Sequence, residues 1–153
     1  VNLSIRDYLR EIITSFKETS DKEFIFNFDQ DSNSKKISKS IEIVYGLRNF
    51  IGNANKFCTK KVFITLKSDS ENTEVCIEDD GKGYPNDIIS KIGEPYLKSL
   101  GSSNKEKTGL GLGIFIGKTL LEKNFASVNC WNSKTRSGAE VVIKWKNSKL
   151  FKI

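Results

Sequence analysis

Two amide side chains and one ammonium lie in a row on a predicted helix. Residues 40–58 run without proline, and Asn49, Asn53 and Lys56 follow one another at spacings of four and three. This spacing places side chains on one face of an α-helix. Such a row suits a hydrated cation and a phosphate, because amide oxygens ligate hard cations and an ammonium attracts an anion. A solvated helix face is the simpler alternative.

The second candidate is a turn rich in aspartate and glycine. Asp79, Gly81 and Gly83 belong to the run DDGKG, which follows directly on a predicted strand. A buried, ionised aspartate here would accept a hydrogen bond from an exocyclic amine, and glycines let a flat base approach the backbone. A strand-ending turn with glycines at positive φ explains the same residues. The run lacks the spacing of an EF-hand calcium loop.

The third candidate is a run of alternating glycines, GLGLG, which contains Gly109, Gly111, Leu112 and Gly113. We expect a helix over 110–123, so this run would open it. The N–H groups at a helix N-terminus suit phosphate oxygens. The GxGxG spacing and the polar stretch before it exclude a dinucleotide-binding fingerprint. A role of the glycines in packing alone is the alternative.

These candidates need strands and helices that bring them together. Alternation of apolar and polar residues predicts five strands, over 23–28, 61–67, 73–78, 126–132 and 139–145. Helical periodicity and capping residues predict four helices, over 5–16, 40–58, 86–92 and 110–123. Most of the strands pair in hairpins. The sequence therefore predicts an α/β fold, a two-layer sandwich with helices on one face of a mixed, mostly antiparallel sheet.

Two further features belong to this framework. Ser4 is expected to be the N-cap of the first helix. One apolar stripe of the long helix is expected to face the core, and it consists of Val44, Leu47, Ile51, Ala54 and Cys58. Residues 97–108, rich in serine, lysine and glycine, are expected to form a loop.

Length and composition exclude several classes of protein. The 153 residues suit one domain, 1–153, and the net charge is +6, from 25 basic and 19 acidic residues. Because the chain has no histidine, Ser-His-Asp and Cys-His nucleophile systems and the common zinc sites are impossible. Three scattered cysteines favour reduced thiols, and no apolar run reaches the roughly 20 residues of a membrane span. Since the chain starts at Val1 and lacks methionine, we expect it to be a piece of a longer protein.

Taken together and in this order, the motifs resemble the GHKL superfamily, specifically the catalytic ATP-binding domain of bacterial sensor histidine kinases. NANKF at 53–57 is similar to the family's asparagine box, and DDGKG to its first glycine box. GEPYLKS at 93–99 is similar to the phenylalanine box, with Tyr96 in place of phenylalanine. The run that begins at Gly109 is similar to the second glycine box. The resemblance covers about residues 1–147 and is closest to the redox-responsive Reg/Prr type of sensor kinase.

The resemblance implies the Bergerat ATP-binding fold and a site for Mg-ATP between the asparagine helix and the glycine-rich segments. Asp79 is expected to accept a hydrogen bond from the N6 amino group of adenine, and Phe57 to wall the base. Asn53, with help from Asn49, is expected to hold Mg²⁺, while Lys56 meets a phosphate.

The remaining residues of the implied site come from the glycine boxes and a lid. Backbone N–H groups of the second glycine box are expected to bind the phosphates, and Gly81 and Gly83 to border the base. The lid corresponds to residues 97–108. Its candidates for closing over the γ-phosphate are Lys98, Lys105 and Lys107.

The implied activity is that of a protein-histidine kinase, of which this chain holds the catalytic domain. In hydrolysing relatives a carboxylate activates water from the position that Asn49 fills here, and an amide cannot act as a general base. That difference favours phosphoryl transfer. In the family the acceptor histidine lies on a separate dimerisation domain, so this chain, lacking histidine, is not expected to autophosphorylate.

The expected partners are the dimerisation domain of the parent kinase and a cognate response regulator, with no nucleic acid. We expect a dimeric parent anchored in the bacterial inner membrane, with this domain in the cytoplasm and monomeric as a fragment. Alternative functions are a GHKL-type ATPase, an anti-sigma-type serine kinase, or a non-enzymatic basic interaction module. The last rests on the charge and on a pI near 9.2. The even spread of lysines among 19 acids is better explained by solubility.

Overall fold

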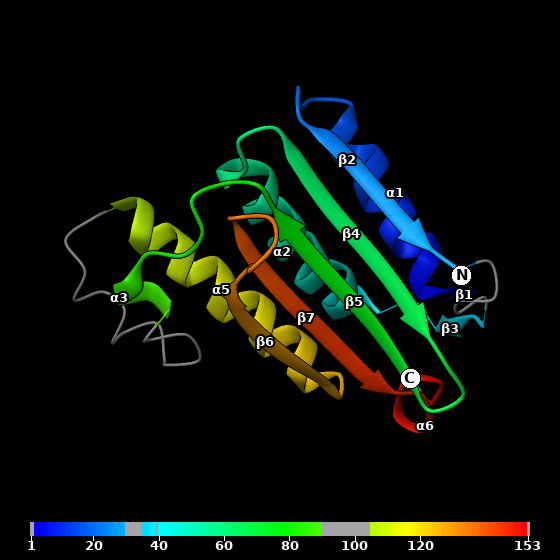
Figure 1. Ribbon diagram of the computed structural model, residues 1–153. Coiled ribbons are helices and arrows are strands. Elements are labelled where there is room, and N and C mark those ends of the chain that lie inside the picture. Colours follow the sequence, from blue (N-terminus) through cyan, green and yellow to red (C-terminus); the bar gives the residue numbers. More distant parts are fainter. Residues whose placement is uncertain (1, 30–34, 39, 90–104, 153) are drawn as a thin grey trace.

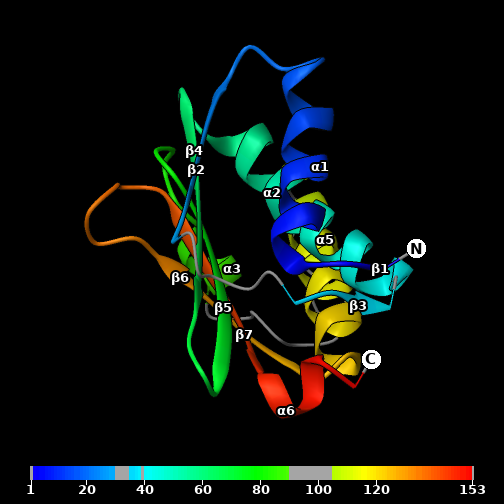
Figure 2. The ribbon, with the colours of Figure 1, turned by 90° about the vertical axis from the view of Figure 1, so that its right-hand side faces the viewer.

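The structure, a computed structural model, describes residues 2–29, 35–38, 40–89 and 105–152. Residues 105–110 are described by their backbone alone. The chain forms two layers, with a sheet on one side and helices on the other (Figures 1 and 2). The sheet has five strands in the order β2-β4-β5-β7-β6. They are β2 (Glu23–Phe28), β4 (Lys61–Ser68), β5 (Asn72–Asp79), β6 (Ala126–Asn132) and β7 (Ala139–Lys146). The predicted two-layer fold is confirmed.

Strand pairing brings the end of one strand beside the start of another. β2 runs parallel to β4, and the other neighbours are antiparallel. In the β5–β7 ladder, Glu78 pairs with Glu140, so Asp79 at the end of β5 lies beside the first residues of β7. This end of the sheet is where the candidate site is found.

Three longer helices cover one face of the sheet (Figure 2). They are α1 (Ile5–Lys17), α2 (Ile41–Phe57) and α5 (Lys105–Lys123). Ser4 and Asp7 form a capping box at the start of α1, which confirms the expected N-cap. Ser40 caps α2 by accepting a hydrogen bond from the N–H of Ile43 at 3.2 Å.

The shorter elements lie at the edges of this core. β1 (Asn2–Leu3) and β3 (Ile37–Ser38) form an antiparallel pair of their own. α3 (Asn86–Ile89) follows the glycine-rich turn, and α6 (Asn147–Leu150) ends the chain next to the β4–β5 hairpin. Residues 90–92 of the predicted third helix lie outside the described residues. Among the described helices, none combines the length and the apolar character needed to cross a membrane.

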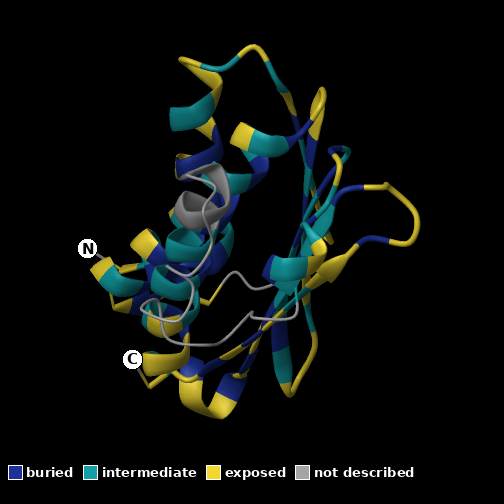
Figure 3. Cartoon of the chain, turned by 90° about the vertical axis from the view of Figure 1, so that its left-hand side faces the viewer, coloured by how far each residue is buried: buried dark blue, intermediate teal, exposed yellow. Residues whose placement is uncertain are grey.

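The core lies between the two layers, where buried residues concentrate (Figure 3). Leu47 and Ile51 of α2 are completely buried, as predicted, but Val44 is only half-buried. Ile43 and Phe50 take core positions instead. The stripe prediction was too narrow because α2 packs on the sheet and on two neighbouring helices, which buries a wider arc than one stripe.

The start of α5 differs from the prediction. We expected the helix to begin at the glycine run, but it begins at Lys105, so the glycines lie inside it. Lysine and glutamate are good helix formers, and nothing in the sequence KEKT stops a helix that extends in the N-terminal direction. Of the predicted lid 97–108, residues 105–108 therefore belong to α5, and 97–104 lie outside the described residues.

Candidate functional site

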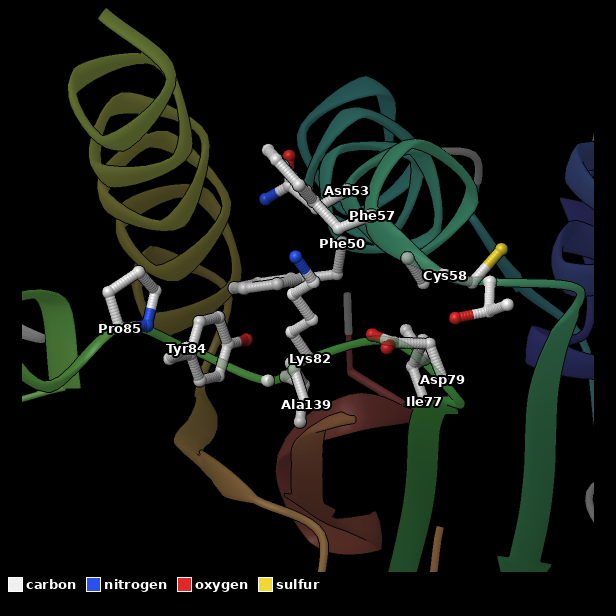
Figure 4. Close-up of a pocket in the computed structure, with 14 residues that line it drawn as sticks. Phe50, Asn53, Phe57, Cys58, Ile77, Asp79, Lys82, Tyr84, Pro85 and Ala139 are labelled. Atoms are coloured by element: carbon white, nitrogen blue, oxygen red, sulfur yellow. The ribbon is translucent and has the colours of Figure 1, made fainter. Parts of the chain in front are cut away.

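A cavity of about 400 Å³ lies between the C-terminal half of α2, the end of β5, the turn that follows it and the start of β7 (Figure 4). Its walls are mainly apolar, and they are formed by Phe50, Ala54, Phe57, Ile77, Tyr84 and Val141. The charged and amide side chains that line it are Asp79, Lys82 and Asn53. A mostly apolar cavity with a few converging polar groups is typical of a small-molecule site.

Four of the sequence-predicted site residues line this cavity, and they are Asn53, Phe57, Asp79 and Gly83. Gly113 of the second glycine box is close by, because a β-carbon added there would lie 3.0 Å from the amide of Asn53. Three stretches that are distant in sequence thus meet around one place. That these residues bind a ligand stays a prediction.

Asp79 is the buried acid of the cavity. Its side chain is 4% exposed, and its Oδ1 accepts a hydrogen bond from the N–H of Gly81 at 2.8 Å. Burial raises the pKa of the Asp79 carboxyl, and the N–H groups of Gly81 and Ala139 act in the opposite direction. A carboxylate with so little water around it gains from a ligand that donates a hydrogen bond.

Two glycines allow the backbone to pack tightly around Asp79. A β-carbon at Gly81 would collide with the backbone oxygen of Phe57. A β-carbon at Gly138, just before β7, would collide with Oδ1 and the backbone oxygen of Asp79. The sequence prediction included Gly81 among the site residues but missed Gly138, which no local motif marks.

The second aspartate of the DDGKG run has a structural role. Oδ1 of Asp80 accepts hydrogen bonds from the N–H groups of Thr59 at 2.8 Å, Lys60 at 3.0 Å and Lys61 at 3.2 Å. Although burial opposes ionisation, these N–H groups hold the pKa of Asp80 below its usual value. Asp80 therefore ties the turn after β5 to the turn between α2 and β4.

The asparagine row of α2 divides in the structure. Nδ2 of Asn53 is buried without a hydrogen-bond partner in the described part of the chain, and Asn53 lines the cavity. Asn49 instead donates to the backbone oxygen of Tyr45 at 2.7 Å and does not line the cavity. Lys56 is exposed, with its ammonium 5.2 Å from the centre of the Phe57 ring. Of the three, Asn53 is the one that the structure brings into the site.

The glycine run is not the helix start that we predicted. Only the first four N–H groups of an α-helix lack an intrahelical acceptor. Because α5 begins at Lys105, the N–H groups of Gly109, Gly111 and Gly113 fall within the helical pattern. Leu112 is half-buried, and Gly111, Leu112 and Gly113 are not among the described residues that line the cavity. Of the lid lysines, Lys98 lies outside the described residues, and Lys105 and Lys107 belong to the first turn of α5.

Several cavity residues were missed, above all Tyr84 and Lys82. Tyr84 is buried, and burial, together with the nearby thiol of Cys130, raises the pKa of its hydroxyl. Asn132 of β6 holds this part of the chain, because its Oδ1 accepts from the N–H of Tyr84 at 2.6 Å and its Nδ2 donates to the Tyr84 carbonyl at 3.3 Å. Gly83 packs against the same asparagine with a φ of +79°. These contacts join residues far apart in sequence, so spacing could not reveal them.

One group of potential metal ligands among the described residues lies outside the cavity, on the face of the sheet that no helix covers. Donor atoms of Cys76, Glu78 and Glu140 lie within 4.8 Å of one another. Glu78 already accepts from Ser133 at 2.9 Å and pairs with Arg136 at 3.6 Å. Because hydrogen bonds and an ion pair already engage these side chains, we assign no ion to them.

Comparison with known proteins identifies the family. The family of histidine kinase-, DNA gyrase B- and HSP90-like ATPases matches residues 38–149. The chain belongs to this family, and the resemblance inferred from the sequence motifs is confirmed. Membership in a family of ATPases implies that the domain binds ATP.

Similar proteins include sensor histidine kinase RegB from Cereibacter sphaeroides, which is 33% identical over 130 residues. The match covers 75% of this chain and 28% of RegB, so the chain spans little more than a quarter of that relative. It agrees with the resemblance to Reg-type kinases.

Two solved structures share the fold. The nucleotide-free catalytic domain of histidine kinase ThkA has a TM-score of 0.75 at 20% identity, with 95% of this chain and 96% of that chain covered. Full-length ShkA, solved in complex with AMPPNP, has a TM-score of 0.74 at 20% identity, with 95% of this chain and 30% of that chain covered. At these identities the likeness shows the fold alone.

Proposed function

We propose that this domain binds Mg-ATP in the cavity and donates the γ-phosphate to a histidine on a separate dimerisation domain. The observation that carries the proposal is the buried carboxylate of Asp79 at one end of an apolar cavity whose other wall holds the Asn53 amide. Membership in a family of ATPases and the AMPPNP complex of ShkA support it.

Adenine recognition falls to Asp79 in this proposal. The N6 amino group of adenine donates a hydrogen bond, whereas guanine presents an acceptor oxygen at the equivalent position. A buried carboxylate facing that oxygen would lose its hydrogen bond and be repelled, which costs more than the loss of a solvated contact. The apolar walls suit the faces of the base, with Phe57 on the side of α2.

Mg²⁺ binding falls to Asn53. Asn53 lines the cavity, and its buried Nδ2 has no hydrogen-bond partner among the described residues, so its amide can turn to present its oxygen to a hydrated cation. When bound, Mg²⁺ neutralises charge on the phosphate oxygens during transfer. The residues of the chain orient the nucleotide and exclude water from the base.

Transfer is favoured over hydrolysis by the residue at position 49. Asn49 donates its amide to the backbone of its own helix and offers no carboxylate to activate water. The alternative of a GHKL-type ATPase is therefore weaker. Similarity to sensor histidine kinases disfavours a serine kinase, and the cavity disfavours a purely basic interaction module. The remaining partners follow from RegB being a sensor histidine kinase. They are an acceptor domain and a response regulator, in a parent with this domain on the cytoplasmic side of the membrane.

The proposal is tested by incubating the isolated chain with γ-labelled ATP. We expect no acid-labile phosphate on this chain, because it has no histidine. We expect labelling of an added dimerisation domain from a sensor kinase of the same type, and loss of that labelling with Asn53→Ala.

Two results would contradict the proposal. Stoichiometric acid-labile phosphate on the isolated chain is one of them. The other is steady, multiple-turnover release of inorganic phosphate that is lost with Asn49→Ala, since that would make the domain a hydrolase.

A further inference from the structure

Lys82 is a cavity residue whose charge has no counterpart in the described part of the chain. It lies between the two glycines of the DDGKG turn, and it lines the cavity. None of the ion pairs among the described residues involves its ammonium. Its charge is thus available to a ligand.

The side chain of Lys82 is directed toward the cavity. Figure 4 shows it rising from the turn toward α2, with the ammonium on the side of Asn53 and away from the Asp79 carboxylate. A lysine that pointed outward from the turn would be an ordinary surface residue. Lys82 is exposed, but its ammonium is directed toward the cavity that the residue lines.

The backbone on both sides of Lys82 is held in place. Before it, Asp80 is tied to the N–H groups at the start of β4. After it, Asn132 forms two hydrogen bonds with the backbone of Tyr84. These contacts fix the backbone of Lys82 at the cavity, so that its ammonium is within reach of a ligand there.

Charge therefore divides the cavity into two parts. Asp79 is the negative group at the end of β5, and Lys82 is the positive group nearer to the Asn53 amide. Between them lie apolar walls. A matching ligand carries a hydrogen-bond donor on a flat apolar part and an anionic group at some distance from it.

We propose that Lys82 is a nucleotide-binding residue that contacts the phosphate chain. This inference rests on the proposed function, because it takes the base to lie against Asp79. Lys82 then contributes affinity for ATP over adenosine and has no part in the recognition of adenine.

The test compares ATP with adenosine, which lacks phosphates. Lys82→Gln removes the charge and keeps most of the length of the side chain. Lys60→Gln is the matched control, because Lys60 is exposed, lies in the turn between α2 and β4 and does not line the cavity. Calorimetric titration at fixed ionic strength gives the affinity of each variant for each ligand. We expect Lys82→Gln to weaken ATP binding about tenfold, as is usual for hydrogen bonds to charged groups. Adenosine binding is expected to stay within about twofold of wild type.

The control variants separate the possible outcomes. We expect Lys60→Gln to bind ATP like wild type, and Lys82→Arg to retain most of the ATP affinity because it retains the charge. Unchanged ATP affinity in Lys82→Gln would overturn the inference, and so would equal losses for ATP and adenosine. Failure of the proposed function looks different, since the wild type would then bind neither ligand, which overturns both proposals. Thermal unfolding of each variant checks that the fold is intact.

Discussion

Asp79 shows how the backbone creates a functional side chain. The carboxylate is buried at the end of β5, and burial raises its pKa, so the empty cavity is an unfavourable place for its charge. It is held there because Gly81 and Gly138 lack β-carbons that would collide with neighbouring atoms. An amino group from a ligand relieves part of this cost.

At the scale of single residues, Gly138→Ala tests this packing. The added methyl group meets the carboxylate and backbone of Asp79, so something must shift. We expect the free energy of unfolding to fall by about 1–3 kcal/mol, as for other overpacked sites, together with a loss of ATP affinity. Chemical denaturation and nucleotide titration measure the two effects.

Gly52→Ala is the matched control for that substitution. Gly52 lies in α2, and a β-carbon there would be 3.4 Å from the nearest atom of Phe16, an ordinary contact. Since alanine is the better helix former, we expect stability to rise by about 0.5–1 kcal/mol. If Gly138→Ala were as well tolerated as Gly52→Ala, the tight packing around Asp79 would be refuted.

At the scale of elements, α5 combines a helical conformation with a sequence that weakens it. Gly109, Gly111 and Gly113 all lie in its N-terminal half. Each glycine lowers helix stability by about 0.8–1 kcal/mol relative to alanine. If these N–H groups bind phosphates, as the resemblance implies, the start of the helix must open when ATP binds. The glycines make that opening inexpensive.

Gly111→Ala tests whether α5 opens. We expect the substitution to stabilise the helix and to weaken ATP binding by about fivefold, which corresponds to about 1 kcal/mol of helix propensity. The far-ultraviolet circular dichroism of the wild type should lose helical signal when ATP is added, and the variant should lose less. Thr119→Ala, at an exposed position later in the same helix, should leave ATP affinity unchanged. ATP binding without loss of helical signal in the wild type would contradict this account of α5.

The same elements show what local sequence can predict. The strands and the first two long helices follow from alternation, periodicity and the capping residue Ser4, because these signals lie within a few residues of one another. The predicted start of α5 was wrong because the helix-forming residues before the glycines outweigh the preference of glycine for a helix end. Local patterns fix the presence of an element more reliably than its boundary.

At the scale of the whole molecule, the site exists because the fold joins distant stretches of chain. α2 supplies Asn53, β5 supplies Asp79, and α5 packs Gly113 against the amide of Asn53. Motifs predicted these three contributions. They did not predict Gly138 or Asn132, whose roles depend on the pairing of β5 with β7 and of β6 with β7.

The most direct test of the account is the affinity of the domain for ATP and GTP, each with Mg²⁺, in wild type and Asp79→Asn. Asp21→Asn is the matched control, because Asp21 is exposed and does not line the cavity. We expect wild type and Asp21→Asn to prefer ATP over GTP by at least about tenfold, and Asp79→Asn to lose most of its ATP affinity. Equal affinity of the wild type for ATP and GTP, or wild-type ATP binding by Asp79→Asn, would contradict the proposal that this cavity recognises adenine through Asp79.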